Sequence, residues 1–152
     1  MPTQKLQDYL DQHDIQYVTI SHSPAYTAQR IAELTRIPGK ELAKTVIVKV
    51  DDKLAMAVLP ASRRVNLQHL QEAMGADEVT LSSETEFNEL FPDCEVGAMP
   101  PFGNLYDMGV YVAEQLTEDD EIAFNAGSHS ELVKMSYNDY AKLVTPQVVS
   151  LT

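Results

Sequence analysis

Two neighbouring apolar stretches constrain the fold of this chain most strongly, because their side chains alternate as those of β-strands do. In residues 44–50, a valine stands at every second position from 46 onward and alternates with Thr45, Ile47 and Lys49. Asp51-Asp52 is a turn signal, and residues 54–59 form a second apolar stretch. The sequence therefore predicts a β-hairpin over residues 44–59.

Helices and further strands are predicted on both sides of the hairpin. Five residues that can cap a helix N-terminus precede the predicted helices: Thr3, Thr27, Asn66, Ser83 and Ser136. We expect these helices to end near residues 13, 37, 74, 90 and 143. Short strands are predicted over residues 17–21, 110–113, 121–125 and 131–135. This mixture predicts one α/β domain over residues 1–152, of the α+β kind, with helices around a mixed and mostly antiparallel sheet.

Length and cysteine content bound the setting of the chain. Its 152 residues suit one domain with an ordinary core. The single cysteine, Cys94, excludes an intrachain disulfide, which suits a reducing compartment. No apolar run approaches the ~20 residues that span a bilayer, and the first residues lack a signal-peptide core. We therefore expect a cytoplasmic protein without a membrane partner.

The charge distribution is more informative than the net charge of −12, which by itself argues against a nucleic-acid partner. Residues 30–64 carry a net charge of +4, whereas residues 65–152 carry −14. Eight of the eleven lysines and arginines lie in that first window. The window predicts a local polyanion-binding face on an acidic body, with ordinary solvated surface charge as the alternative.

Several well-known chemical signatures are absent from the sequence. There is no glycine-rich phosphate loop, no dinucleotide-binding fingerprint and no Gly-x-Ser-x-Gly nucleophile motif. The four histidines lie far apart and show no zinc-ligand spacing. Cys94 has no base near it in sequence and is better interpreted as a small packed residue than as a nucleophile. We therefore expect neither a metal nor a cofactor.

Three segments remain as candidates for chemistry, each with a structural alternative. Lys44 opens an apolar strand and could project its ammonium into a cleft, or could be an edge lysine that reaches solvent. Residues 97–103 place two prolines between two glycines, which suits either a ligand-binding loop or a tight connection. Residues 125–129 offer amide, hydroxyl and imidazole groups between two predicted strands, although a turn histidine such as His129 is often only exposed.

Taken together, these segments resemble the YbaK and prolyl-tRNA-synthetase-associated editing domain family of aminoacyl-tRNA deacylases. The resemblance covers most of the chain. The matching segments occur in the family's order: His22-Ser23-Pro24 with Thr27, residues 43–48, residues 58–60, residues 63–67, residues 97–103, residues 110–112, Gly127-Ser128-His129, and Leu132, Met135, Ser136 and Asp139-Tyr140. The lysine-bearing strand and the Gly-x-x-x-Pro motif are the most specific of these when they occur together.

The resemblance implies a partly closed central sheet and hydrolysis of the ester that joins a small amino acid to the terminal adenosine of transfer RNA. It implies metal-independent chemistry and a catalytic set of Lys44, Gly97 and His129. Residues expected to bind the substrate are Tyr26, Thr27, Ala98, Met99, Pro100, Gly127 and Ser128. Residues expected to bind RNA are Arg30, Lys40, Arg63 and Arg64.

The specific expectation is a trans-editing enzyme that removes alanine or cysteine, with proline transfer RNA as the substrate body. Its expected partners are the acceptor end of transfer RNA and prolyl-tRNA synthetase, and the expected state is a monomer or weak dimer. Two alternatives stay open at this point: a non-catalytic nucleic-acid-binding or regulatory protein with the same fold, and a small-molecule-binding domain.

Overall fold

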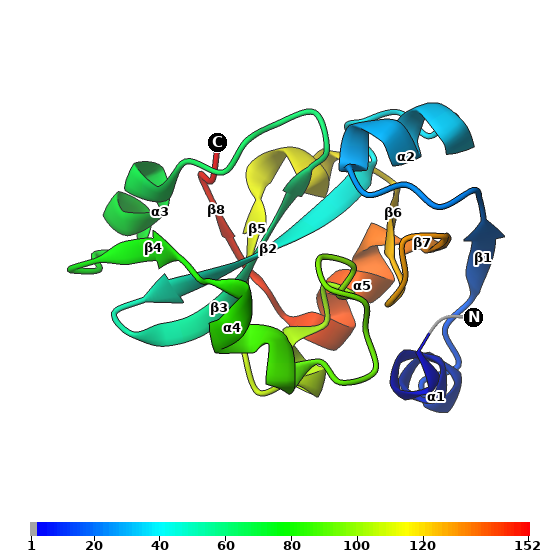
Figure 1. The fold of residues 1–152 in the computed structure, drawn as a ribbon. Coiled ribbons are helices and arrows are strands. Elements are labelled where there is room, and N and C mark those ends of the chain that lie inside the picture. The colour runs from blue at the N-terminus through cyan, green and yellow to red at the C-terminus, as the bar shows by residue number, and fades with distance from the viewer. Residues whose placement is uncertain (1–2) are drawn as a thin grey trace.

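The predicted hairpin lies in the middle of an eight-stranded sheet in the computed structural model, which describes residues 3–152 (Figure 1). Strands β2 (Leu42–Val50) and β3 (Lys53–Pro60) pair antiparallel, from Ala43 opposite Pro60 to Val50 opposite Lys53. Asp51 and Asp52 form the turn between them, both with positive φ, as the turn signal in the sequence predicted. The hairpin is therefore confirmed.

The remaining strands extend the sheet on both sides of the hairpin. The order is β1 (Tyr17–Ser21), β7 (Glu131–Ser136), β6 (Glu121–Asn125), β2, β3, β5 (Gly109–Ala113) and β8 (Gln147–Val149), and β4 (Val79–Leu81) pairs with β2. The pairs β2–β6, β3–β5 and β5–β8 are parallel, and the other four pairs are antiparallel. The expected mixed sheet with flanking helices is confirmed.

The helices begin at the capping residues that the sequence indicates. They are α1 (Gln4–Gln12), α2 (Ala28–Thr35), α3 (Leu67–Met74), α4 (Glu84–Phe87) and α5 (Tyr137–Val144). The side chains of Thr3, Thr27, Asn66 and Ser136 each accept a hydrogen bond from a backbone amide of the first turn. Each cap satisfies an amide that would otherwise lack a partner, which is why the starts of these helices could be predicted.

Both faces of the sheet are covered, so the alternating side chains seen in the sequence pack into buried clusters on opposite faces. Ile47, Met56 and Val58 share a core with α1 and α5, which contribute Leu6 and Tyr140 among others. On the opposite face, Val48 packs with α3 and Leu42 packs with α2. Figure 1 shows α3 and α2 at opposite ends of this second face, over different parts of β2.

The structure differs from the sequence prediction mainly in its short elements. β4 and β8 are three residues long, too short to show an alternation, and neither was predicted. The helix expected up to residue 90 ends at Phe87 and continues as a 3-10 turn, η1 (Asn88–Leu90), while η2 (Gly103–Leu105) and η3 (Glu114–Glu118) are further short turns. β2 begins at Leu42, two residues earlier than predicted, because its first residues pair with β6.

Tyr140 provides a test of how the core supports the 97–103 loop. Its hydroxyl is fully buried and donates to the carbonyl of Pro101 at 2.7 Å. Tyr140→Phe leaves that buried carbonyl unpaired, and we expect the free energy of unfolding to fall by about 1–3 kcal/mol in urea denaturation. Tyr111→Phe is the matched control, since the half-buried Tyr111 hydroxyl has no partner in residues 3–152, and it should change stability by less than about 0.5 kcal/mol. Equal effects of the two variants would contradict this role of the hydrogen bond.

Candidate active site

Two different strands, β6 and β4, pair with the same edge of β2. The candidate site lies at the stretch of this edge that neither strand covers. β6 pairs with Leu42 and Ala43, and β4 pairs with residues 48–50 of the same strand. Within residues 3–152, no strand pairs with residues 44–47 on that edge. Figure 1 shows β6 and β4 toward opposite ends of β2. Lys44 is the first residue of this gap.

Lys44 is a half-buried cation without an acidic partner. Its ammonium makes no hydrogen bond or ion pair within residues 3–152. Burial lowers the pKa of Lys44 from its ordinary value, and the nearby positive charge of Arg64 lowers it further. Two like charges in a partly desolvated place favour an anion between them, and a phosphate group has the matching charge and acceptor oxygens.

The loop that follows β6 is tied to the 97–103 loop by backbone hydrogen bonds. The Gly127 amide donates to the Ala98 carbonyl at 2.9 Å, and the Glu95 amide donates to the Gly127 carbonyl at 2.7 Å. Gly127 has a φ of 105°, and a Cβ at this position would overlap the Thr3 side chain. Glycine is therefore required here on both conformational and steric grounds.

His129 lies buried against the start of the 97–103 loop, with only 8% of its surface exposed. Its Nε2 is 2.7 Å from the Val96 carbonyl, and because a carbonyl only accepts, this nitrogen carries the proton and donates. In the neutral imidazole Nδ1 is then the acceptor, and this atom is buried without a hydrogen-bond partner in residues 3–152. Gly97, with φ of 84°, lies against the same ring: a Cβ there would be 3.6 Å from His129 Cε1.

The segment between β1 and α2 packs against another side of the loop that carries His129. The Ala25 amide donates to the His129 carbonyl at 3.0 Å, and the ring of Tyr26 lies 4.7 Å from the imidazole, centroid to centroid. Tyr26 is 75% exposed, so it covers the histidine from the solvent side. Thr27 caps α2 by accepting from the Arg30 amide at 3.2 Å. The Thr27 hydroxyl oxygen therefore already accepts one bond within the protein, and its hydrogen remains available to donate.

Most of the substrate-binding residues predicted from the sequence lie in this assembly. Ala98, Gly127 and Tyr26 are joined by the contacts above to Gly97 and His129, two of the residues predicted to be catalytic. Met99 and Pro100 are buried, and Met99 belongs to the main core, whereas Ser128 is half-buried with its hydroxyl 3.4 Å from that of Ser130. Lys44 has no hydrogen bond to His129, and it follows Ala43, the last residue of β2 that pairs with β6.

The predicted RNA-binding residues are all exposed on nearby segments. Gln29 of α2 donates to the Ala61 carbonyl at 3.3 Å, which brings α2 beside the turn that carries Arg63 and Arg64. Arg30 is paired at the surface with Glu33 at 3.1 Å. Such an exposed pair contributes little and can be exchanged for a phosphate contact.

Sequence reasoning missed one residue of the site, Thr3, and noted Asn125 within residues 125–129 without including it among the expected site residues. Thr3 does more than cap α1, because its amide donates to the Ala126 carbonyl at 3.0 Å and its methyl group lies against Gly127. Asn125 is the last residue of β6, and its Oδ1 is buried without a hydrogen-bond partner. A polar residue ending a mostly apolar stretch was the available signal for Asn125, whereas nothing local pointed to the second role of Thr3.

Other features of the described residues lie outside this site. Burial raises the pKa of the Cys94 thiol to about 11, so the thiol stays protonated at neutral pH, in agreement with its interpretation as a packed residue. Within residues 3–152, no three His, Cys, Asp or Glu side chains gather closely enough to hold a metal ion. In the same range, no helix is both long enough and apolar enough to cross a membrane.

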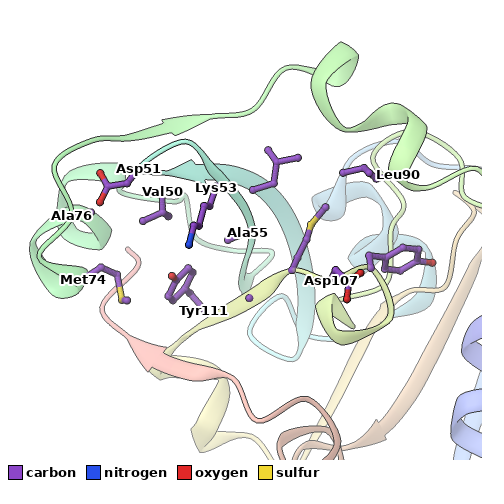
Figure 2. A pocket seen from close by; sticks show the side chains of 13 residues that line it. Val50, Asp51, Lys53, Ala55, Met74, Ala76, Leu90, Asp107 and Tyr111 are labelled. Atoms are coloured by element: carbon purple, nitrogen blue, oxygen red, sulfur yellow. The ribbon is translucent and has the colours of Figure 1, made fainter.

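A cavity of about 850 Å³ lies elsewhere, at the turn end of the β2–β3 hairpin (Figure 2). Val50, Met74 and Tyr111 line one part of it, and Leu90 and Asp107 line another. It includes none of the site residues predicted from the sequence. Cavity size therefore does not locate the candidate site, which is defined by its loops and polar groups.

Comparison with known proteins places the chain in a family. Residues 22–143 match the model of the aminoacyl-tRNA editing domain. The chain is 28% identical to the multifunctional Ser/Thr-tRNA deacylase ProXp-y of Escherichia coli strain K12, over 97% of this chain and 90% of that protein. It is 29% identical to a stretch of proline–tRNA ligase from Bacillus cereus, over 54% of this chain and 14% of the ligase.

Solved structures agree on the fold. A crystal structure of a hypothetical protein superposes with a TM-score of 0.86 at 20% identity, covering 97% of this chain and 99% of the other. A candidate trans-editing enzyme for prolyl-tRNA synthetase superposes with a TM-score of 0.82 at 18% identity, covering 97% and 94%. Because residues 22–143 match the family model, this chain belongs to the aminoacyl-tRNA editing domain family.

Gly127 tests the contact between the N-terminal cap and the site loop. We expect Gly127→Ala to destabilise the protein more than Gly75→Ala does, because Gly75 has a positive φ but a Cβ added there would meet no atom within 4 Å. Gly75→Ala should cost about 1–2 kcal/mol from backbone strain, and Gly127→Ala about 1–3 kcal/mol more from overpacking. Urea denaturation measures both.

Thr3→Ser provides the decisive control, since it removes the obstructing methyl group and keeps the capping hydroxyl. In a Thr3→Ser background, Gly127→Ala should recover most of the additional loss. No recovery would mean that Thr3 is not the obstructing group.

Proposed function

We propose that this chain is a trans-editing hydrolase that cleaves the ester between a small amino acid and the terminal adenosine of a mischarged transfer RNA. The amino acids we propose are alanine, cysteine and, from the name of the Escherichia coli relative, serine or threonine. We propose proline transfer RNA as the substrate body and prolyl-tRNA synthetase as a partner, because relatives of this domain lie within such ligases.

The observation that carries the proposal is the fixed orientation of His129 against the start of a loop that contains two unpaired backbone donors. The amides of Gly97 and Met99 donate to no group in residues 3–152, whereas the Ala98 amide is already paired with Glu95. Backbone amides without partners can stabilise the negative charge that develops on an ester carbonyl oxygen during attack. In the neutral imidazole Nδ1 is a further acceptor, which could hold the hydrogen of an attacking water where substrate binding uncovers this buried atom.

In the proposed reaction, a water oxygen adds to the ester carbonyl and the bond from the carbonyl carbon to the ribose 3′ oxygen breaks. One water proton passes to that oxygen, and the products are the free amino acid and transfer RNA with a free hydroxyl. Lys44 and Arg64 would hold the phosphate next to the terminal adenosine, which fixes the ester relative to the loops. Arg30, Lys40 and Arg63 would contact phosphates further along the acceptor stem.

A panel of transfer RNAs mischarged with alanine, cysteine, serine or threonine tests the activity directly. We expect wild type to release at least one of these amino acids above the uncatalysed rate. Lys44→Ala should lower kcat/KM about 100-fold or more, because a displaced ester loses the benefit of fixed geometry. Lys142→Ala, a change on the exposed surface of α5, is the matched control and should leave kcat/KM unchanged.

The alternative of a non-catalytic RNA-binding protein predicts a different result in the same panel. It predicts salt-sensitive binding of transfer RNA with no release of any amino acid. The exposed basic residues around α2 are the observation that favours this alternative. Full activity of Lys44→Ala would contradict the mechanism even if wild type is active.

The charge state of Lys44 offers a test that does not depend on substrate. Burial and Arg64 both disfavour the charged form, so Lys44 should lose its proton at a lower pH than an ordinary lysine. Arg64→Ala removes one of the two causes, and the pKa of Lys44 should therefore rise. NMR titration of lysine side chains, with Lys44 assigned through Lys44→Arg, measures the shift, and an unchanged pKa would show that the two cations do not interact.

A further inference from the structure

Asn125 stands at the point where the open edge of β2 meets the loop that carries His129. The parallel register of β2 and β6 pairs Leu42 with Ala123 and Ala43 with Phe124. The pairing stops there, and Lys44 and Asn125 are the next residues of the two strands. The two residues share a face of the sheet, because side chains alternate and each stands two positions after a member of the cluster that contains Leu42 and Ala123.

The surroundings of Asn125 on that face are apolar and well packed. Leu132 lies directly opposite it on β7, and Leu42, Ala123 and Leu132 are each no more than 2% exposed. Ala25 and Ile31, from the segment before α2 and from α2 itself, complete the same cluster. The Asn125 amide is thus a polar group at the margin of a small apolar patch.

This amide has no partner inside the protein. Its Oδ1 is buried and accepts no hydrogen bond, and neither end of the amide is bonded to any group in residues 3–152. A buried acceptor without a donor is unfavourable, and proteins retain such groups mainly where a ligand completes them. The ammonium of Lys44, the residue of β2 that follows the last pair with β6, is a donor and is unpaired as well.

We propose that Asn125 is a specificity-determining residue that accepts a hydrogen bond from the side-chain hydroxyl of a seryl or threonyl ester. This inference rests on the proposed deacylase function and deepens it by assigning a residue that distinguishes hydroxyl-bearing esters from the alanyl ester. A hydroxyl can donate to Asn125 Oδ1, whereas the methyl group of an alanyl ester would leave the buried acceptor unpaired. A site built to bond a hydroxyl discriminates strongly against the analogue that lacks it.

The thiol of a cysteinyl ester lies between these two cases, because sulfur is a weak donor. The proposal therefore orders the esters by their dependence on Asn125: serine and threonine first, cysteine next and alanine last. If the amide instead bound the α-ammonium group, all four esters would depend on it equally, since every aminoacyl ester carries that group.

The test compares esters on one transfer RNA body. Proline transfer RNA is charged in turn with serine, threonine, cysteine and alanine, and kcat/KM is measured with wild type and with Asn125→Leu, which keeps the approximate size and removes the acceptor. We expect the ratio of kcat/KM for the seryl ester to that for the alanyl ester to fall about tenfold or more. A ratio measured on one preparation is independent of how much of the variant is folded.

Asn138→Leu, an exposed position on α5, is the matched control and should leave the ratio unchanged. An unchanged ratio in Asn125→Leu, with both rates altered equally or not at all, would overturn the assignment of Asn125 while leaving the deacylase function standing. A wild-type protein that releases none of the four amino acids would instead overturn the proposed function, and this inference with it.

Discussion

The division of one edge of β2 between β6 and β4 is the constraint on which the rest of the site depends. A strand edge normally continues along a single neighbour, but here the parallel contact with β6 ends after Ala43 and the antiparallel contact with β4 begins at Val48. The strand still has β3 along its other edge, which keeps it in the sheet. A lysine can therefore stand within the sheet and beside a loop at the same time.

Two loops fill the region beyond β6, and each restrains the other. Gly127 and Ala98 share a backbone hydrogen bond, His129 donates to Val96, and Tyr26 covers the imidazole from outside. These contacts leave a small number of polar groups unpaired, among them His129 Nδ1 and Asn125 Oδ1. Rigid loops with a small number of unpaired donors and acceptors suit the binding of a small polar group.

The charged residues divide the protein into an acidic body and a basic segment. The acidic body carries most of the charge, while the cations gather in residues 30–64, around α2, β2 and the turn after β3. An acidic surface repels RNA, so under the proposed function the basic segment would accept the phosphate chain and orient the acceptor end toward Lys44. Net charge by itself would have pointed away from an RNA substrate.

The sequence by itself determined the elements with strong local signals. Alternating valines set the hairpin, capping side chains set the starts of helices, and glycines at 97 and 127 marked the loops, because each of these acts through neighbours in the chain. Only the tertiary structure decided which groups meet: Thr3 against Gly127, Ala43 of β2 beside Phe124 of β6, and His129 bonded to Val96. These partners come from distant segments, and their contact depends on strand order and register, which local patterns do not encode.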